Sequence, residues 1–157
     1  MTADRFVGDR FKGDRFVEDR FVEDVAVGDE LPAVIRTASR AQLFLYSAAT
    51  WNPHRIHYDR EYAAVEGHAD VLVHGPLQGA WLTQFLTDWA GPKARLVRAE
   101  WQHRRPAFPD RAYTWQGRIT AVDPGSGEVT VEVSELDDDG VRCVPGTAVI
   151  RLPRRTA

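Results

Sequence analysis

The chain has 157 residues, of which 43% are hydrophobic and 27% are charged. This length and balance suit one folded domain, and they exclude both a disordered chain and two well-packed domains. The formal net charge of −3 leaves no positive excess for binding nucleic acid. The single cysteine, Cys143, excludes an internal disulfide and a metal site built from several cysteines.

No apolar run in the sequence reaches the length of a transmembrane helix, and charged residues recur throughout the N-terminal region. A signal peptide is therefore not expected. We expect a cytoplasmic protein that acts without a membrane and without nucleic acid.

A five-residue repeat, Asp-Arg-Phe-Val-Gly and its variants, occupies residues 4–23. A spacing of five fits neither the face of a helix nor the face of a strand for long. We predict that residues 1–24 form a poorly ordered leader, of which only the last repeat copy touches the domain, and that residues 25–157 form the domain. The alternative is an arm whose phenylalanines dock on a partner subunit.

The domain begins with a turn around Gly28, a short strand over residues 34–37 and a helix over residues 40–49 that Ser39 caps. Residues 50–70 lose this periodicity and gain His, Asn, Pro and Tyr. Such a composition is typical of loops that carry chemistry.

A second helix is predicted over residues 76–90. Gly75 suits its N-cap, Pro76 suits its first position, and a Gly-Pro pair ends it. Gln78 projects into an apolar arc, and Gly79 permits close approach by a neighbour. The arc consists of Trp81, Leu82, Phe85, Leu86 and Trp89. This pattern indicates a buried helix.

Strands follow the second helix. Apolar residues alternate with polar ones around Val97, Ala99 and Trp101, from Tyr113 to Ala121, and from Val129 to Val133, and a last strand ends near Leu152. Period-two patterning with short turns predicts an antiparallel sheet with one face covered by the buried helix, which is the α+β class.

Two histidines, His54 and His57, stand three positions apart in the loop after the first helix. Zinc needs three or four convergent ligands, and no Glu or Cys stands at ligand spacing here, so we expect no metal. Histidine titrates near neutral pH, which favours proton transfer. The alternative is that these rings only hydrogen-bond backbone groups.

The start of the second helix is the other candidate site. Unpaired N–H groups and the helix dipole can hold a developing oxyanion there, and Gly75 lets a ligand approach. A buried amide such as Gln78 needs hydrogen-bond partners, either in a ligand or in neighbouring backbone.

Taken together, these segments resemble the MaoC-like branch of the hot-dog fold, the (R)-specific enoyl-CoA hydratases and 3-hydroxyacyl dehydratases. The resemblance runs from about Val25 to Pro153 and rests on residues 52–59 (NPHRIHYD), 74–78 (HGPLQ) and 104–109 (RRPAFP). The first two segments are closest to the mesaconyl-C4-CoA hydratase-like subgroup. The resemblance implies a single domain in which a curved antiparallel sheet wraps around a long central helix, and a homodimer.

The resemblance also implies roles for individual residues in a hydratase or dehydratase. His57 would move the proton, with Asn52 and Thr50 beside the water. The substrate would be an acyl-CoA or an acyl carrier protein thioester, and no cofactor is implied. The residues expected to bind it are Gly75, His74, Gln78, His54 and Arg55.

One position departs from the family motif, which has an Asp two residues before the Asn, where this chain has Thr50. That Asp works with the His as a dyad, and the link between Asn and His is also two residues longer here. Thr50 can hydrogen-bond a water, but it cannot act as a carboxylate base. A slow or redirected enzyme is compatible with this change.

Two other functions remain open from the sequence. One is a non-catalytic thioester-binding subunit that pairs with an active partner, which the Thr50 substitution favours. The other is a thioesterase, which usually needs a carboxylate on the central helix. Asp88 is the only acid between residues 76 and 90, and it lies near the far end on the polar side.

Overall fold

The computed structural model describes residues 18–155. A short 3-10 helix, η2 (Val22–Asp24), precedes strand β1, and a second one, η3 (Arg55–His57), lies between two helices. The helices are α1 (Arg40–Ala49), α2 (Arg60–Val65) and α3 (Gly75–Ala90). The strands are β1 (Glu30–Arg36), β2 (Arg95–Trp101), β3 (Tyr113–Asp123), β4 (Glu128–Leu136) and β5 (Arg142–Arg151).

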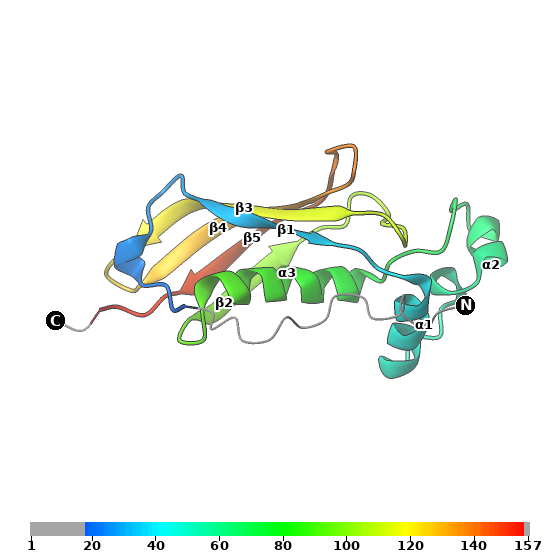
Figure 1. Cartoon of the computed structure of the whole chain (residues 1–157), viewed down its shortest axis with the longest axis horizontal. Coiled ribbons are helices and arrows are strands. Elements are labelled where there is room, and N and C mark those ends of the chain that lie inside the picture. Colours follow the sequence, from blue (N-terminus) through cyan, green and yellow to red (C-terminus); the bar gives the residue numbers. More distant parts are fainter. Residues whose placement is uncertain (1–17, 156–157) are drawn as a thin grey trace, which may run out of the picture.

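The strands form one sheet in the order β1-β3-β4-β5-β2, and every neighbouring pair is antiparallel. Helix α3 lies along one face of this sheet, while α1 and α2 lie beyond one end of it (Figure 1). The predicted α+β class and the sheet packed around a central helix are confirmed.

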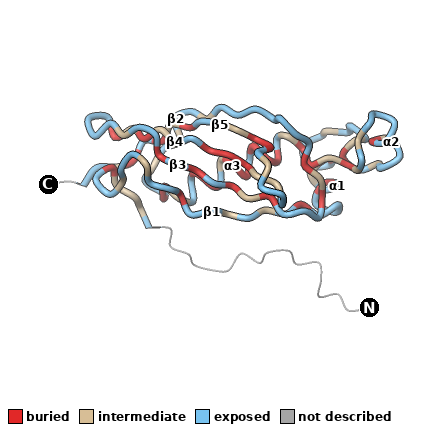
Figure 2. Tube along the Cα trace, turned by 90° about the horizontal axis from the view of Figure 1, so that it is seen from above, coloured by how far each residue is buried: buried red, intermediate tan, exposed pale blue. Residues whose placement is uncertain are grey.

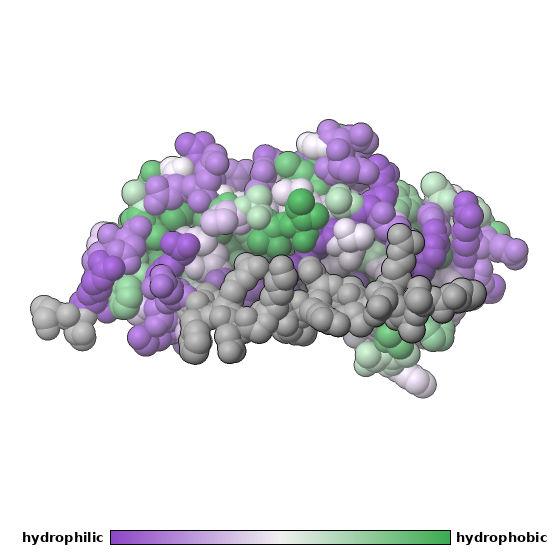
Figure 3. All heavy atoms as spheres, viewed as in Figure 1, coloured by the Kyte–Doolittle hydropathy of each residue, from purple (hydrophilic) through white to green (hydrophobic). Residues whose placement is uncertain are grey.

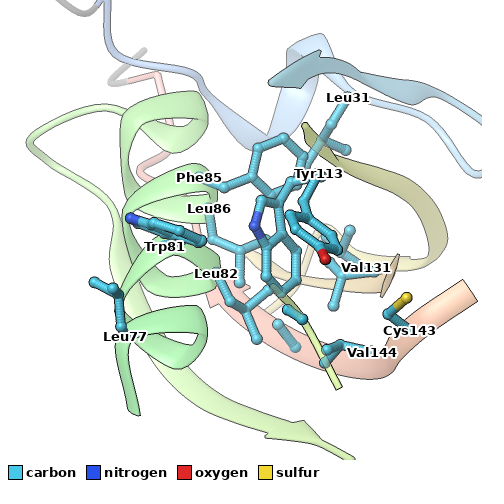
Figure 4. Close-up of a cluster of buried hydrophobic side chains, with 14 of the residues drawn as sticks. Leu31, Leu77, Trp81, Leu82, Phe85, Leu86, Tyr113, Val131, Cys143 and Val144 are labelled. Atoms are coloured by element: carbon cyan, nitrogen blue, oxygen red, sulfur yellow. The ribbon is translucent and has the colours of Figure 1, made fainter. Parts of the chain in front are cut away.

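The core lies between α3 and the sheet. Leu82, Phe85 and Leu86 point from α3 toward the inward side chains of the strands, among them Val131 and Val144 (Figure 4). The buried tube segments follow the same layer, which runs along the middle of the molecule (Figure 2). Burying this apolar area is the main force that holds α3 against the sheet.

The two predicted helices are present. Ser39 caps α1, and its Oγ accepts a hydrogen bond from the Gln42 N–H at 3.1 Å. The prediction of the α3 start was wrong by one residue, because His74 and not Gly75 is the N-cap. Helix α2 lies within the segment interpreted as a loop, and the Asp59 side chain caps it.

The edge strand β2 carries a register shift between Leu96 and Arg98. The shift leaves Val97 45% exposed, while Leu96 packs against the core. The indole ring of Trp101 lies over Gly79, where an added Cβ would come within 2.6 Å of it. The close approach expected at Gly79 is therefore made by a tryptophan of the edge strand.

Residues 18–24 lie against the far end of α3. Val22 is buried, and the Arg20 side chain donates a hydrogen bond to the Trp89 carbonyl at 2.8 Å. Packing thus extends ahead of Val25, where the sequence placed the start of the domain. The earlier copies of the repeat lie outside the described residues.

Some large apolar side chains stay on the surface. Phe44 and Leu45 of α1 and the following Trp51 are exposed. Hydrophobic side chains around α1 are visible at the lower right of Figure 3. Within residues 18–155, no helix has both the length and the apolar character that a membrane crossing requires.

Candidate active site

His57 lies at the end of η3 and is buried. Its Nδ1 is 2.9 Å from the Leu72 carbonyl oxygen. A carbonyl can only accept, so Nδ1 carries the hydrogen and Nε2 keeps its lone pair. Burial lowers the pKa of His57 below its ordinary value, and the bond to Leu72 opposes this in part. The ring is therefore held as a neutral base.

Backbone hydrogen bonds around Leu72 hold the carbonyl that orients the His57 ring. The Leu72 N–H donates to the Ile56 carbonyl at 2.9 Å, and the Val73 N–H donates to the Ala107 carbonyl at 2.8 Å. The backbone around Leu72 is thus tied on both sides. Rigid backbone support of this kind is what orients a catalytic ring.

His74, the N-cap of α3, lies directly against His57. The two rings are stacked, with centroids 3.7 Å apart and planes inclined by 17°. The Nε2 of His74 lies 2.8 Å from the Ser47 Oγ. Complete burial, followed by the proximity of His57, lowers the pKa of His74 to about 4. His74 is thus a buried neutral ring that supports His57 from behind.

The first turn of α3 presents one free backbone donor. Pro76 has no N–H, and the N–H groups of Leu77 and Gln78 both donate to the His74 carbonyl. The N–H of Gly75 has no partner among the hydrogen bonds of the described residues. This donor sits at the positive end of the helix dipole, where a developing negative charge is stabilised.

His57, Gly75 and Gln78 line one pocket of about 380 Å³. The remaining lining residues are His68, Leu72, Val73, His103, Arg104, Arg105, Pro106 and Ala107. This lining contains no carboxylate. A base, an oxyanion donor and a polar amide therefore meet at one cavity of ligand size.

Gln78 has a buried partner that sequence reasoning missed. Its Nε2 donates to the Oε2 of Glu135 on β4 at 2.6 Å. Burial raises the pKa of Glu135 to about 7. The alternation of β4 could have predicted that Glu135 points inward, because it continues the inward series Val129, Val131 and Val133 at period two.

The pocket lining lacks five predicted site residues, which are His74, already described, and Thr50, Asn52, His54 and Arg55. The Thr50 hydroxyl donates to the Tyr46 carbonyl at 2.6 Å, at the C-cap of α1. Asn52 accepts the backbone N–H of His54 through its Oδ1 at 3.3 Å. Both side chains thus bond to nearby backbone in the structure.

The side chains of His54 and Arg55 have protein partners. His54 lies 3.4 Å from a carboxylate oxygen of Glu66. Arg55 pairs with Asp59 at 2.5 Å, and its guanidinium lies 4.5 Å from the centre of the Tyr62 ring. The structure therefore brings His57, His74, Gly75 and Gln78 together and leaves the other four at the margin.

Two arginines border the pocket on the side of the segment after β2. Arg104 and Arg105 are exposed, and neither has an ion-pair partner within residues 18–155. The ring of His103 lies next to the start of α3, since a Cβ on Gly75 would meet its Nε2 at 3.1 Å. This rim carries positive charge beside an apolar interior.

A family model described as hydroxyacyl-thioester dehydratase type 2 matches residues 28–109. That stretch contains His57, His74, Gly75 and Gln78. A solved structure of a MaoC-like dehydratase aligns with a TM-score of 0.81 and 27% identity, covering 85% of this chain and 42% of that chain.

Two relatives of known activity are also similar. The beta subunit of 3-oxo-4,17-pregnadiene-20-carboxyl-CoA hydratase from Mycobacterium tuberculosis is 28% identical over 107 residues, which are 68% of this chain and 81% of that protein. The mesaconyl-C(4)-CoA hydratase of Chloroflexus aurantiacus is 54% identical over 43 residues, which are 27% of this chain and 15% of that protein.

Proposed function

The chain belongs to the hydroxyacyl-thioester dehydratase type 2 family of MaoC-like hot-dog proteins, and we propose that its pocket catalyses the reversible addition of water to a 2-enoyl thioester. The product of hydration is the 3-hydroxyacyl thioester. One observation carries the proposal: the neutral base His57 and the unpaired N–H of Gly75 line the same cavity.

Dehydration needs a base, because the α-proton of a 3-hydroxyacyl thioester is weakly acidic. The Nε2 of His57 takes this proton while the Gly75 N–H donates to the thioester oxygen, where negative charge gathers. The C3–O bond then breaks, and the departing hydroxyl receives the proton from His57 and leaves as water. Hydration follows the same path in reverse.

Thr50 has no catalytic role in this scheme, because its hydroxyl bonds to the Tyr46 carbonyl. His57 moves both protons alone, without the Asp of the family motif. We expect Thr50→Asp to preserve or raise activity.

The substrate that best fits the pocket is an acyl-CoA, whose phosphates suit the free positive charges of Arg104 and Arg105. We also propose that two copies pair through the sheet edge at β2, where Val97 and Trp101 are partly exposed. A relative named as a beta subunit makes pairing with a different hot-dog chain the alternative.

A second candidate function is a subunit that binds acyl thioesters without turning them over. The absence of a carboxylate from the described pocket lining favours it. A thioesterase is less well supported, because Asp88 is exposed in the last turns of α3 and does not line the pocket.

The test is to incubate the purified protein with 2-enoyl-CoA and 3-hydroxyacyl-CoA thioesters of several chain lengths. Loss or gain of the conjugated double bond is followed by absorbance, and release of free thiol is followed in parallel. Interconversion without free thiol supports the hydratase. Binding without interconversion supports the non-catalytic subunit, and thiol release supports a thioesterase.

A further inference from the structure

Glu135 occupies an inward position of β4, where the alternating pattern of the strand predicts an apolar side chain. It follows Val131 and Val133 on the inward face of β4, and it is 0% exposed. Its cross-strand neighbours are Trp115 on β3 and Val144 on β5, both fully buried. A buried carboxylate costs several kcal/mol relative to a well-packed apolar residue, so stability does not explain it.

The surroundings of Glu135 offer little compensation. Its Oε2 accepts from Gln78, whereas its Oε1 has no partner within the described chain. The titratable neighbours, Tyr113 on β3 and Cys143 on β5, stay neutral because burial raises the pKa of both, that of Cys143 to about 11. Among residues 18–155, no cationic side chain pairs with Glu135. Within residues 18–155, Gln78 is thus the one hydrogen-bond partner of the Glu135 carboxyl.

We propose that Glu135 is a positioning residue, whose carboxylate holds the Gln78 amide with its Oε1 toward the pocket. The inference rests on the proposed hydratase function. An ionised carboxylate can only accept, so it selects the amide N–H₂ and leaves the amide oxygen on the other side. Gln78 is itself only 3% exposed and lines the pocket, so its orientation decides which polar atom a ligand meets.

An amide oxygen at this place suits the chemistry of hydration. A water molecule can donate one proton to the Nε2 of His57 and the other to the Oε1 of Gln78. Its lone pairs are then free to attack C3. An amide turned the other way would present N–H groups, which would bind those lone pairs and oppose attack. Glu135 thus acts through Gln78 to hold the water in its reactive orientation.

Protonation of Glu135 removes this selection. A protonated carboxyl donates to the amide oxygen, and the amide of Gln78 then turns its N–H₂ toward the pocket. Because burial raises the pKa of Glu135 to about 7, the change falls near neutral pH. Activity should therefore require ionised Glu135.

The kinetic test compares Glu135→Leu, Gln78→Leu and the double variant. Glu135→Leu should lower kcat by about 10- to 100-fold with little change in KM, because the water and not the thioester is misplaced. The double variant should be no slower than Gln78→Leu, because both substitutions remove the same oriented amide. Glu132→Gln, on the exposed face of the same strand, is the matched control and should keep wild-type kcat.

Two readouts separate positioning from folding. The double variant should melt at or above the wild-type temperature, because removing both partners of a buried polar pair is neutral or stabilising. The side-chain amide signals of Gln78 in ¹⁵N NMR should titrate near pH 7 in the wild type and not in Glu135→Gln.

The outcomes distinguish this inference from the function beneath it. A wild-type protein without turnover overturns the proposed function and, with it, the role of Glu135. An active wild type with an equally active Glu135→Leu overturns only the positioning role. The positioning role is also overturned if the kcat losses of the two single variants multiply in the double variant. It is overturned as well if the Gln78 amide signals of Glu135→Gln titrate near pH 7 as those of the wild type do.

Discussion

His57 and His74 are stacked ring on ring, with centroids 3.7 Å apart. Two imidazolium cations at this distance would repel strongly in a buried site, so at most one of the rings is charged at a time. His74 is the one that stays neutral, because it is fully buried and its pKa is lowered to about 4. In the proposed reaction the proton is therefore carried by His57, and burial, which disfavours the charged form of this ring, helps it to release the proton.

The pH dependence of kcat/KM should carry an acid limb from His57. Burial lowers the pKa of His57 below 6.5, so the ring remains a neutral base in mildly acidic solution. As the pH drops, the loss of activity caused by His57 should follow this lowered value and add to the loss near pH 7 that protonation of Glu135 causes. The check is a profile of kcat/KM against pH, measured with enoyl thioester concentrations that span KM. The pH titration of the His57 ring signals is followed by NMR in parallel.

A midpoint above pH 6.5 for the ring signals of His57 would contradict the neutral, buried base. His54→Gln is a useful comparison, because a charge on His54 also lowers the pKa of His57. This variant should move the limb slightly upward in pH.

Glu135→Gln should stabilise the protein increasingly as the pH rises. The pKa of Glu135 is raised from 4.5 to about 7 in the folded state, so the folded chain binds this proton more tightly than the unfolded chain does. Stability from this group is complete below about pH 4.5 and is lost as the pH rises through about 7. Glutamine cannot ionise, so the variant keeps the stability that the wild type loses as the pH rises.

Melting curves of both proteins from pH 4.5 to 8 test this directly. The difference in Tm should widen by several degrees up to about pH 7 and then level off. The lowered pKa of His74 has the opposite effect on stability, but it is common to both proteins and cancels in the difference. A constant difference across this range would argue against a buried ionisable Glu135.

Gly75→Pro should separate the backbone donor from its surroundings. Proline fits the first position of a helix and has no N–H. The loss of one oxyanion donor costs about 10²- to 10³-fold in kcat. Gly75→Ala is the matched control, because its Cβ meets His103 at the same place while its N–H remains.

The prediction concerns the ratio of the two variants, measured after both are found folded by circular dichroism. A Gly75→Pro enzyme as active as Gly75→Ala would remove the oxyanion role from this N–H.

Replacing Arg104 and Arg105 together by Ala should weaken the binding of acyl-CoA. Their free charges border the pocket and suit the phosphates of the carrier. We expect KM for an enoyl-CoA to rise about tenfold at nearly constant kcat, whereas an enoyl thioester of N-acetylcysteamine, which lacks phosphate, should be unaffected. Arg118→Ala, at an exposed position of β3, is the control. Equal effects on both substrates would point to a structural role for the two arginines.

The periodic elements could be predicted because their patterns are local. Ser39 capped α1 as expected, and the inward alternation of β3 from Tyr113 to Ile119 is confirmed. Helix α2 could not be predicted, because its six residues are too few for a periodic signal, although Asp59 caps it. The bulge in β2 was missed because register shifts depend on the neighbouring strand.

The site was predictable in part. His57, Gly75 and Gln78 stood out through residue type and position, and they line one pocket. The stacking of His74 and the reach of Glu135 to Gln78 join segments up to 57 residues apart, which no local pattern reveals. The spacing i, i+4 of Arg55 and Asp59 is compatible with the ion pair that they form, whereas the family resemblance implied that Arg55 binds substrate.

The most direct test of the proposed mechanism is the turnover of a 2-enoyl-CoA by the wild type, His57→Ala and His54→Ala, measured as loss of the conjugated thioester. Removing His57, whose Nδ1 donates to the Leu72 carbonyl and whose Nε2 keeps its lone pair, should lower kcat/KM by about 10²- to 10⁴-fold. His54→Ala, a change outside the pocket lining, should have a much milder effect. If His57→Ala turns over the thioester as fast as the wild type, His57 is not the proton carrier and the mechanism proposed for this pocket is wrong.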